Sequence, residues 1–176
     1  MSVDRTEKGM AGMPLRRLIL ISGLVLAVVA MSPAAAMGAA SGNQRPLTGT
    51  ITSTTTISLI TGAASNASSG QLPHLGAVTG SSDEQFVLVP PNGFTWTGTG
   101  TIVAANGDKL FTTISGVGTF GPPLQSTRVD TITGGTGRFA DASGTFTYTS
   151  ISGSQSIVGS IETTINIATI KGIINY

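Results

Sequence analysis

One ion pair and one histidine are the side chains in this sequence best suited to acid–base chemistry or to orienting a ligand. Arg128 and Asp130 lie two positions apart, so on a strand they point to the same face and would orient a ligand inside a barrel. An exposed pair on a strand surface is the simpler interpretation. His74 is the single imidazole of the chain and a candidate acid–base group. A proline precedes it and a glycine follows two positions later, so a residue at the end of a turn is its simpler interpretation.

Aromatic residues in the second half of the chain are spaced so that several share a strand face. Phe94 and Trp96 lie on one face, and Phe146 and Tyr148 on another, because side chains alternate along a strand. With Phe111 these rings would either line an apolar pocket or pack as a core. The candidate ligand-binding residues are therefore Phe94, Trp96, Phe146, Tyr148, Arg128, Asp130 and His74.

Other common kinds of functional site are excluded by the residue types present or by the surrounding sequence. The absence of cysteine excludes disulfides, thiolate catalysis and Cys-type zinc sites. The glycine-rich run Gly134–Gly137 lacks the Lys-Ser/Thr of a P-loop and predicts a tight turn, with Arg138 paired to nearby backbone or an acid and Phe139 plugging one barrel end. Asp83 and Glu84 are interpreted as solvating a serine-rich loop. We assign no catalytic residue, metal ligand or cofactor.

The charge content argues against polyanionic partners. Only 10% of residues are charged, well below the ~25% of ordinary soluble domains, and the formal net charge is +1. After residue 40 the chain has five basic and six acidic residues. Such a surface has no broad positive field, so we expect no nucleic-acid partner and no binding to an anionic membrane surface.

The first forty residues have the composition of an export signal. A basic start precedes Leu18–Ala30, an uncharged apolar run of 13 residues that is shorter than the ~18 expected of a membrane span. Small residues then suit cleavage after Ala36 or, alternatively, Ala40. We expect a signal peptide with a helix over 1–36, a flexible linker over 37–46 and a barrel domain over 47–176. The mature protein would be secreted or periplasmic without a stable membrane anchor, although an uncleaved anchor and either export route stay open.

The sequence after residue 40 predicts strands joined by tight turns. Threonine, isoleucine and valine favour strands, whereas frequent glycine and the lack of a 3.6-residue period disfavour helix. The sequence Ala105-Asn106-Gly107-Asp108 predicts a hairpin with a type I′ turn. Loops are expected over 66–70 and 90–93, and a turn over 152–154. The expected strands are Leu47–Leu59, Gly76–Thr79, Gln85–Val89, Phe94–Ala104, Lys109–Gly116, Leu124–Thr133, Gly144–Ile151 and Ser156–Ile174.

The alternation within these strands favours a closed sheet. Bulky rings alternate with glycine in Phe94–Gly100, which is typical of strongly curved sheets, and closure removes exposed strand edges. A small antiparallel β-barrel is favoured over a sandwich. In the last expected strand, five isoleucines share one parity and are predicted to point inward: Ile157, Ile161, Ile165, Ile167 and Ile173.

Several segments resemble a known barrel family. Ile132–Gly144 (ITGGTGRFADASG) looks like the segment ITGGTGRFxxAxG of allene oxide cyclase barrel-like and dirigent-like proteins. His74–Gly76, Gly98–Leu110 (GTGTIVAANGDKL) and Lys171–Tyr176 (KGIINY) resemble stretches of their small secreted bacterial members. The resemblance covers most of the chain from residue 72 onward. It implies an all-β, closed, antiparallel, calycin-like eight-stranded barrel, preceded here by the signal helix, and a homo-oligomer as in the plant relatives.

The same resemblance does not identify a catalytic site in this sequence. The plant cyclases carry a catalytic glutamate and asparagine on early strands and a cysteine further on, but Leu47–Leu59 has neither an acid nor an asparagine. We therefore expect a secreted barrel, not an enzyme, that binds a small hydrophobic molecule. The alternatives are an isomerase or cyclase of the allene oxide cyclase type acting on a hydrophobic substrate, and a non-enzymatic extracytoplasmic structural module.

Overall fold

A computed structural model describes residues 43–121 and 124–176. The predicted signal peptide, its helix, both candidate cleavage sites and most of the expected linker lie outside the described residues. Residues 44–46, assigned to the linker from sequence, form the start of the first strand. Within the described ranges no helix has the length and apolar character needed to cross a membrane.

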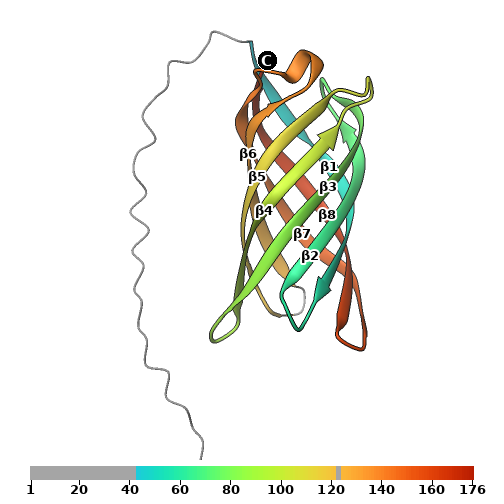
Figure 1. Ribbon diagram of the computed structural model, residues 1–176, viewed down its shortest axis with the longest axis vertical. Coiled ribbons are helices and arrows are strands. Elements are labelled where there is room, and N and C mark those ends of the chain that lie inside the picture. The colour runs from blue at the N-terminus through green and yellow to red at the C-terminus, as the bar shows by residue number, and fades with distance from the viewer. Residues whose placement is uncertain (1–42, 122–123) are drawn as a thin grey trace, which may run out of the picture. The chain divides into compact units, whose positions relative to one another are not determined.

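Eight antiparallel strands follow one another around a closed barrel, and each strand pairs with its neighbours in sequence (Figure 1). One short 3-10 helix, η1, lies between the sixth and seventh strands. The elements are β1 (Gln44–Ser58), β2 (Ala63–Leu72), β3 (Gly76–Val89), β4 (Gly93–Val103), β5 (Lys109–Thr119), β6 (Gln125–Gly135), η1 (Gly137–Phe139), β7 (Ser143–Val158) and β8 (Ile161–Asn175).

The barrel closes through a long ladder between its first and last strands. β1 pairs with β8 along its whole length, from Gln44 opposite Asn175 to Ser58 opposite Ile161. Closure gives every strand two neighbours, although residues 44–49 of β1 and 153–158 of β7 pair on one side only. The prediction of an all-β, closed, antiparallel, eight-stranded barrel is confirmed, and a two-sheet sandwich is not formed.

Two strand assignments made from sequence are wrong. β2 occupies a stretch of serine, alanine, asparagine and glycine whose centre was expected to be a loop, because its composition lacks β-branched residues. Its ladders with β1 and β3 supply the strand conformation that local propensity does not. The two segments expected at Gly76–Thr79 and Gln85–Val89 form one continuous strand, β3.

The predicted turn over 152–154 is also wrong. β7 continues through these residues with a register shift between Ser152 and Ser154, so that Gly153 forms a bulge. The chain reverses at Gly159, whose φ of +61° is readily adopted by glycine. β7 is therefore longer than the sequence suggested, whereas β8 begins at Ile161 rather than at Ser156, and the two strands together extend one wall of the barrel.

The hairpin between β4 and β5 is confirmed, but its turn type differs from the prediction. The Gly107 N–H donates to the Ala104 carbonyl, and the Ala104 N–H donates to the Asp108 carbonyl. Gly107 has a φ of +87°, while Asn106 has an ordinary negative φ. This arrangement is a type I turn followed by a left-handed glycine, rather than the type I′ turn, which needs positive φ at both central positions.

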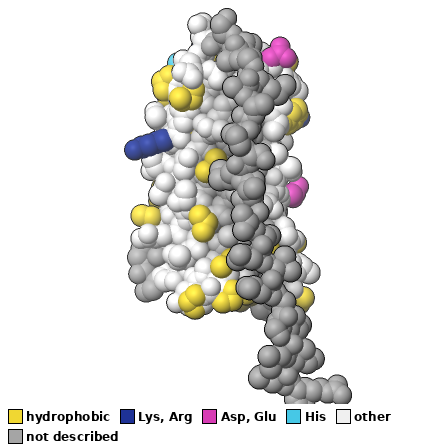
Figure 2. All heavy atoms as spheres, turned by 90° about the vertical axis from the view of Figure 1, so that its left-hand side faces the viewer, with side chains coloured by type: hydrophobic (Ala, Val, Ile, Leu, Met, Phe, Trp, Pro, Cys, Tyr) yellow, Lys and Arg dark blue, Asp and Glu magenta, His cyan; other side chains and the backbone are white. Residues whose placement is uncertain are grey.

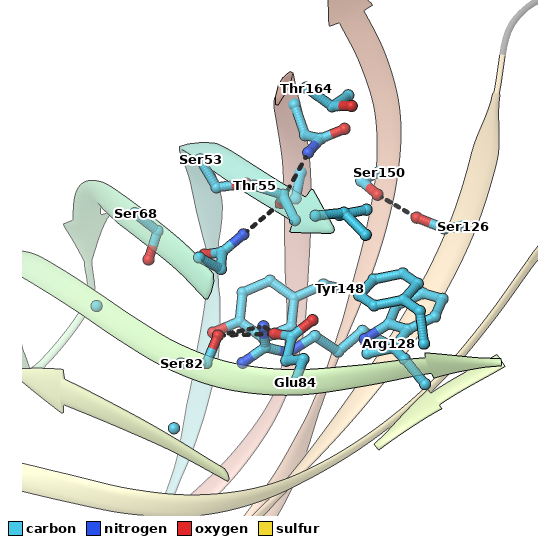
Figure 3. Close-up of a pocket in the computed structure, with 18 of the residues that line it drawn as sticks. Ser53, Thr55, Ser68, Ser82, Glu84, Ser126, Arg128, Tyr148, Ser150 and Thr164 are labelled. Atoms are coloured by element: carbon cyan, nitrogen blue, oxygen red, sulfur yellow. Dashed lines mark hydrogen bonds and ion pairs between the residues drawn. The ribbon is translucent and has the colours of Figure 1, made fainter. Parts of the chain in front are cut away.

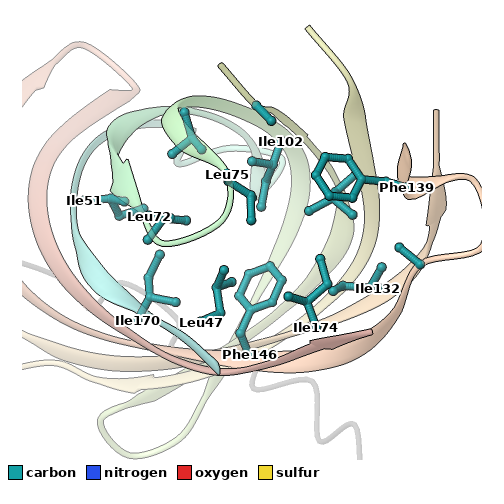
Figure 4. Packing of buried hydrophobic residues seen from close by; sticks show 14 of the residues in the cluster. Leu47, Ile51, Leu72, Leu75, Ile102, Ile132, Phe139, Phe146, Ile170 and Ile174 are labelled. Atoms are coloured by element: carbon teal, nitrogen blue, oxygen red, sulfur yellow. The ribbon is translucent and has the colours of Figure 1, made fainter. Parts of the chain in front are cut away.

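One half of the barrel interior is solid. A cluster of buried apolar side chains fills the end that holds η1 and both chain ends of the described domain (Figure 4). Phe139 plugs this end as predicted: it is fully buried and packs edge-on against Tyr176. The largest fully buried apolar side chains of this core are those of Leu47, Leu75, Leu110, Phe139, Phe146, Ile170 and Ile174.

The isoleucine face of the last strand points outward, which overturns the inward assignment. Ile165 and Ile167 on β8 are 44% and 57% exposed, and Ile157, Ile161 and Ile173 are exposed as well. The other face of β8 carries Glu162, Thr164 and Asn166, which point into the hollow half of the barrel. Polar side chains are accommodated there because they line a cavity rather than an apolar core. The face in Figure 2 likewise shows apolar side chains standing among uncharged polar ones, with few charged groups.

Candidate functional site

The other half of the interior contains a cavity of about 250 Å³. Its lining reaches Leu59, Phe120 and Leu124, in the connections at the barrel end opposite η1. This volume falls just below the roughly 300–1,000 Å³ of common small-molecule sites. An eight-stranded barrel is wide enough to hold one small ligand, and here the space for it is set between a solid floor and the far loops.

An aromatic wall covers one side of the cavity. The ring centroids of Phe86 and Trp96 lie 5.1 Å apart in a nearly parallel stack, and those of Phe94 and Trp96 lie 5.6 Å apart. Two glycines of β5 make room for these rings: a Cβ on Gly116 would stand 2.1 Å from the Trp96 ring, and one on Gly118 would stand 2.2 Å from Phe94. The rings thus pack against bare backbone of the neighbouring strand β5, and not against Gly98 or Gly100, the glycines that alternate with them in the sequence.

An ionic cluster lies beneath this wall. Glu84, Gly98, Ile114 and Asp130 are successive cross-strand partners on β3, β4, β5 and β6. Arg128 joins the two acids across this row: Nη1 donates to Glu84 Oε1 at 2.7 Å, and Nε and Nη2 donate to the two oxygens of Asp130. A bidentate guanidinium–carboxylate pair of this kind is both strong and directional.

The surroundings of the cluster are buried and hydrogen-bonded. Asp130 is fully buried and accepts a further hydrogen bond from Thr112, while Ser82 donates to Glu84 Oε1. Burial alone would lower the pKa of Arg128, but the hydrogen bond and charge of Asp130 outweigh it, and the pKa is raised. The guanidinium therefore stays protonated throughout the physiological range.

Tyr148 lies against the same guanidinium. The Arg128 Cζ atom lies 4.9 Å from the centre of its ring, a cation–π contact. Burial, followed by the negative charge of Asp130, raises the pKa of Tyr148 well above its ordinary value of 10.0. The phenol is consequently a neutral hydroxyl at physiological pH, able to donate a hydrogen bond.

Hydroxyl and amide groups form the opposite wall. Asn66 Nδ2 donates to Thr55 Oγ1 at 2.7 Å, and the hydroxyls of Ser126 and Ser150 lie 2.6 Å apart. Figure 3 shows Ser82, Glu84, Arg128 and Tyr148 gathered on one side of the pocket, facing Ser53, Thr55 and Thr164 on the other. Glu162, which accepts from Thr164, adds a carboxylate to this wall. The cavity is thus apolar on one side and polar on the other.

The structure brings most, but not all, of the sequence-derived candidates together. Phe94, Trp96, Arg128 and Tyr148 line the cavity, and Asp130 lies directly behind Arg128. Phe146 belongs instead to the solid core, where it meets Tyr148 edge-on.

His74 lies apart from this site. It is an exposed turn residue with a φ of +66°, located between β2 and β3 at the barrel end that contains η1. Its carbonyl accepts a hydrogen bond from Arg138, which agrees with the turn interpretation and with the expected backbone partner of Arg138.

Three simpler interpretations made from sequence are wrong. Arg128 and Asp130 are an interior pair rather than an exposed one, because the even-numbered face of β6 turns inward. Glu84 is a buried interior residue, and only its neighbour Asp83 is exposed to solvent. Phe111 points outward and is 40% exposed, so it belongs neither to the buried core nor to the cavity lining.

Glu84, Phe86 and the serine, threonine and asparagine lining were missed from sequence. Reading residues 76–89 as one strand would have found two of them, since Ser82, Glu84 and Phe86 follow one another at period two. For the β2 lining there was no such signal, because Asn66 and Ser68 lie in a segment with loop composition.

The site is able to hold hydrogen-bond donors. Glu84 Oε1 accepts two hydrogen bonds, whereas Oε2 accepts none from the described residues. Within the same residues the buried Trp96 Nε1–H has no partner, and no three His, Cys, Asp or Glu side chains gather as a metal site would require.

Comparison of the chain with family models, with curated proteins and with solved structures gave no match in any of the three searches.

Proposed function

We propose that the barrel domain binds one small, largely apolar molecule in the hollow half of its interior. The observation that supports this proposal is that one half of the interior is filled by packed side chains, whereas the other half contains a cavity of about 250 Å³. A barrel with a purely structural role would gain stability from filling that space, because each missing buried methyl group weakens packing. The rings of Phe86, Phe94 and Trp96 supply an apolar surface for the occupant.

A neutral apolar probe tests this proposal. Trp96 is the single tryptophan of the chain and lines the cavity, so its fluorescence reports occupancy directly. Titration of the purified barrel with octan-1-ol, followed by fluorescence and by calorimetry, is expected to show saturable 1:1 binding. Mass spectrometry of the protein as purified would identify a natural occupant.

A matched pair of variants shows where the probe binds. Ser53 faces the cavity, whereas Thr52, its neighbour on β1, is exposed on the outer surface. Ser53→Phe is expected to abolish octan-1-ol binding by filling the cavity, and Thr52→Phe is expected to leave it unchanged. Equal binding by both variants would place the probe elsewhere and overturn the proposal.

A second candidate function is isomerisation or cyclisation of a bound hydrophobic substrate. It is favoured by Glu84, because proton transfer requires an acid–base group within the cavity that holds the substrate. Recovery of a natural occupant in unchanged form after incubation supports simple binding. Conversion to an isomer of the same mass, lost in Glu84→Gln, supports catalysis.

We also propose that this domain is exported and that it is a calycin-like relative of the allene oxide cyclase barrel-like proteins. The basic start, the apolar run Leu18–Ala30 and the following small residues support export. Expression of the full chain in a bacterial host, followed by N-terminal sequencing of the exported protein, tests it. A mature N-terminus at residue 37 or 41 is expected, and retention of the full chain in the cytoplasm would contradict export.

A further inference from the structure

The charges around the cavity are unequal, and this imbalance bears on the kind of molecule that fits. Glu84 and Glu162 line the cavity and Asp130 lies directly behind it, while Arg128 is the one basic residue of the lining. The formal charge of these four groups is −2. Other basic side chains of the described domain lie elsewhere: Lys109 and Lys171 are exposed, and Arg45 and Arg138 stack on Tyr176.

The hydrogen-bonding capacity of the cluster is equally one-sided. Arg128 directs Nε, Nη1 and Nη2 at the two carboxylates, so its charge is already matched by acids of the protein. Glu84 has an oxygen, Oε2, that accepts no hydrogen bond from the described residues, although the side chain is only 3% exposed. Oε2 is not fully enclosed by the protein, so it is open to the cavity and can accept a hydrogen bond from a ligand N–H.

The position of Glu84 relative to the aromatic wall fixes the orientation of such a ligand. Phe86 follows two positions later on the inner face of β3, one step closer to the open end, and stacks with Trp96. Leu88, Phe120 and Leu124 continue the apolar lining toward the loops. An occupant that places its polar group at Glu84 would therefore leave its apolar part against these rings.

We infer that the ligand is an amphiphilic amine: a small apolar body with a protonated amino group that donates to Glu84. This inference rests on the proposed binding function and deepens it by naming the ligand class. An ammonium group offsets part of the −2 charge in a poorly solvated cavity, whereas a carboxylate would raise the negative charge to −3 at a site whose guanidinium is already paired. The cavity therefore selects against fatty acids and similar anions.

Three probes with one apolar body and different head groups test the inference. Octylamine, octan-1-ol and octanoate are titrated at pH 7 into the purified barrel domain, with Trp96 fluorescence and calorimetry as readouts. Octylamine is expected to bind at least tenfold more tightly than octan-1-ol, and octanoate at least tenfold more weakly. Octanoate binding as tightly as octylamine would overturn the inference.

Two adjacent carboxylates provide a matched pair of variants. Glu84→Gln is expected to remove the preference for octylamine, so that the variant binds octylamine and octan-1-ol with equal affinity. Asp83→Asn removes the same charge from the neighbouring exposed residue and is expected to change neither affinity. If Glu84→Gln does not fold, Glu162→Gln takes its place, with a smaller loss of octylamine binding expected.

The outcomes separate this inference from the proposed function. Binding of octan-1-ol without any preference for octylamine overturns the amine inference and leaves the binding function standing. No binding by any of the three probes overturns both. An octylamine affinity that is unchanged in Glu84→Gln and in Glu162→Gln shows that the amine does not use these carboxylates, which also overturns the inference.

Discussion

Arg128 donates from Nε and Nη2 to the two carboxylate oxygens of Asp130, two positions further along the inner face of β6. The same guanidinium reaches across the barrel interior to Glu84 on β3. Local sequence spacing supplies one half of this cluster, and barrel closure supplies the other. The cluster forms the boundary between the solid half of the interior and the cavity.

Removal of the Asp130 charge is expected to destabilise the barrel strongly. Asp130 is fully buried, and in the variant Arg128 would lose its bidentate partner and keep only Glu84; breaking a buried ion pair costs about 3 kcal/mol or more. Urea denaturation of Asp130→Asn should show this loss in the free energy of unfolding. Asp141→Asn, at an exposed position, should change it by less than about 0.5 kcal/mol. Equal stability of the two variants would contradict the interior role of the pair.

Tyr148 is expected to make the fold sensitive to alkaline pH. Its pKa is raised in the folded state, so above pH 10 the unfolded chain releases the phenol proton while the folded chain retains it. The unfolded state then binds fewer protons, and the free energy of unfolding falls as pH rises, by up to about 1.4 kcal/mol per pH unit. Denaturation curves between pH 9 and pH 12 measure this slope.

The control for the pH prediction is Tyr148→Phe. This variant lacks the ionising group and should lose stability less steeply above pH 10, with other titrating groups contributing equally in both proteins. A slope identical to that of the unmodified chain would show that Tyr148 does not carry the effect.

Gly116 is expected to tolerate no side chain. A Cβ there would stand 2.1 Å from the Trp96 ring, so Gly116→Ala must displace the indole or the strand, at a cost of about 1–3 kcal/mol. Trp96 fluorescence and thermal unfolding measure the displacement and the cost together. Gly121→Ala should leave both unchanged, because among the described residues, chain neighbours apart, no atom lies within 4 Å of the added Cβ. An unchanged emission spectrum in Gly116→Ala would contradict the ring–glycine packing.

Isoleucines on opposite faces of β8 are expected to differ in their contribution to stability. Ile170 is fully buried in the solid half, whereas Ile167 is 57% exposed. Ile170→Ala should cost about 2–5 kcal/mol through lost burial and a cavity, and Ile167→Ala should cost less than about 1 kcal/mol. Chemical denaturation of the two variants compares them. The reverse order would restore the inward isoleucine face that the sequence pattern suggested.

Period-two alternation was sufficient to predict an all-β barrel and the shared faces of Phe94 with Trp96 and of Phe146 with Tyr148. Turn chemistry located the hairpin at Asn106-Gly107, and the same alternation placed Arg128 and Asp130 on one face. These features are local. Each depends on residues that lie close together in the sequence, and each is present whenever that segment forms a strand or hairpin.

The tertiary structure alone decided which face of each strand is inside, and therefore what the site is. Alternation shows that a strand has two faces, but it does not show which face points into the barrel. In β8 the more apolar face points outward, because the inner face in the hollow half carries Glu162, Thr164 and Asn166. β2 is a strand only because β1 and β3 bind it from both sides. Glu84 joins Arg128 across 44 positions of sequence, since barrel closure, rather than any local pattern, brings β3 and β6 to face the same cavity.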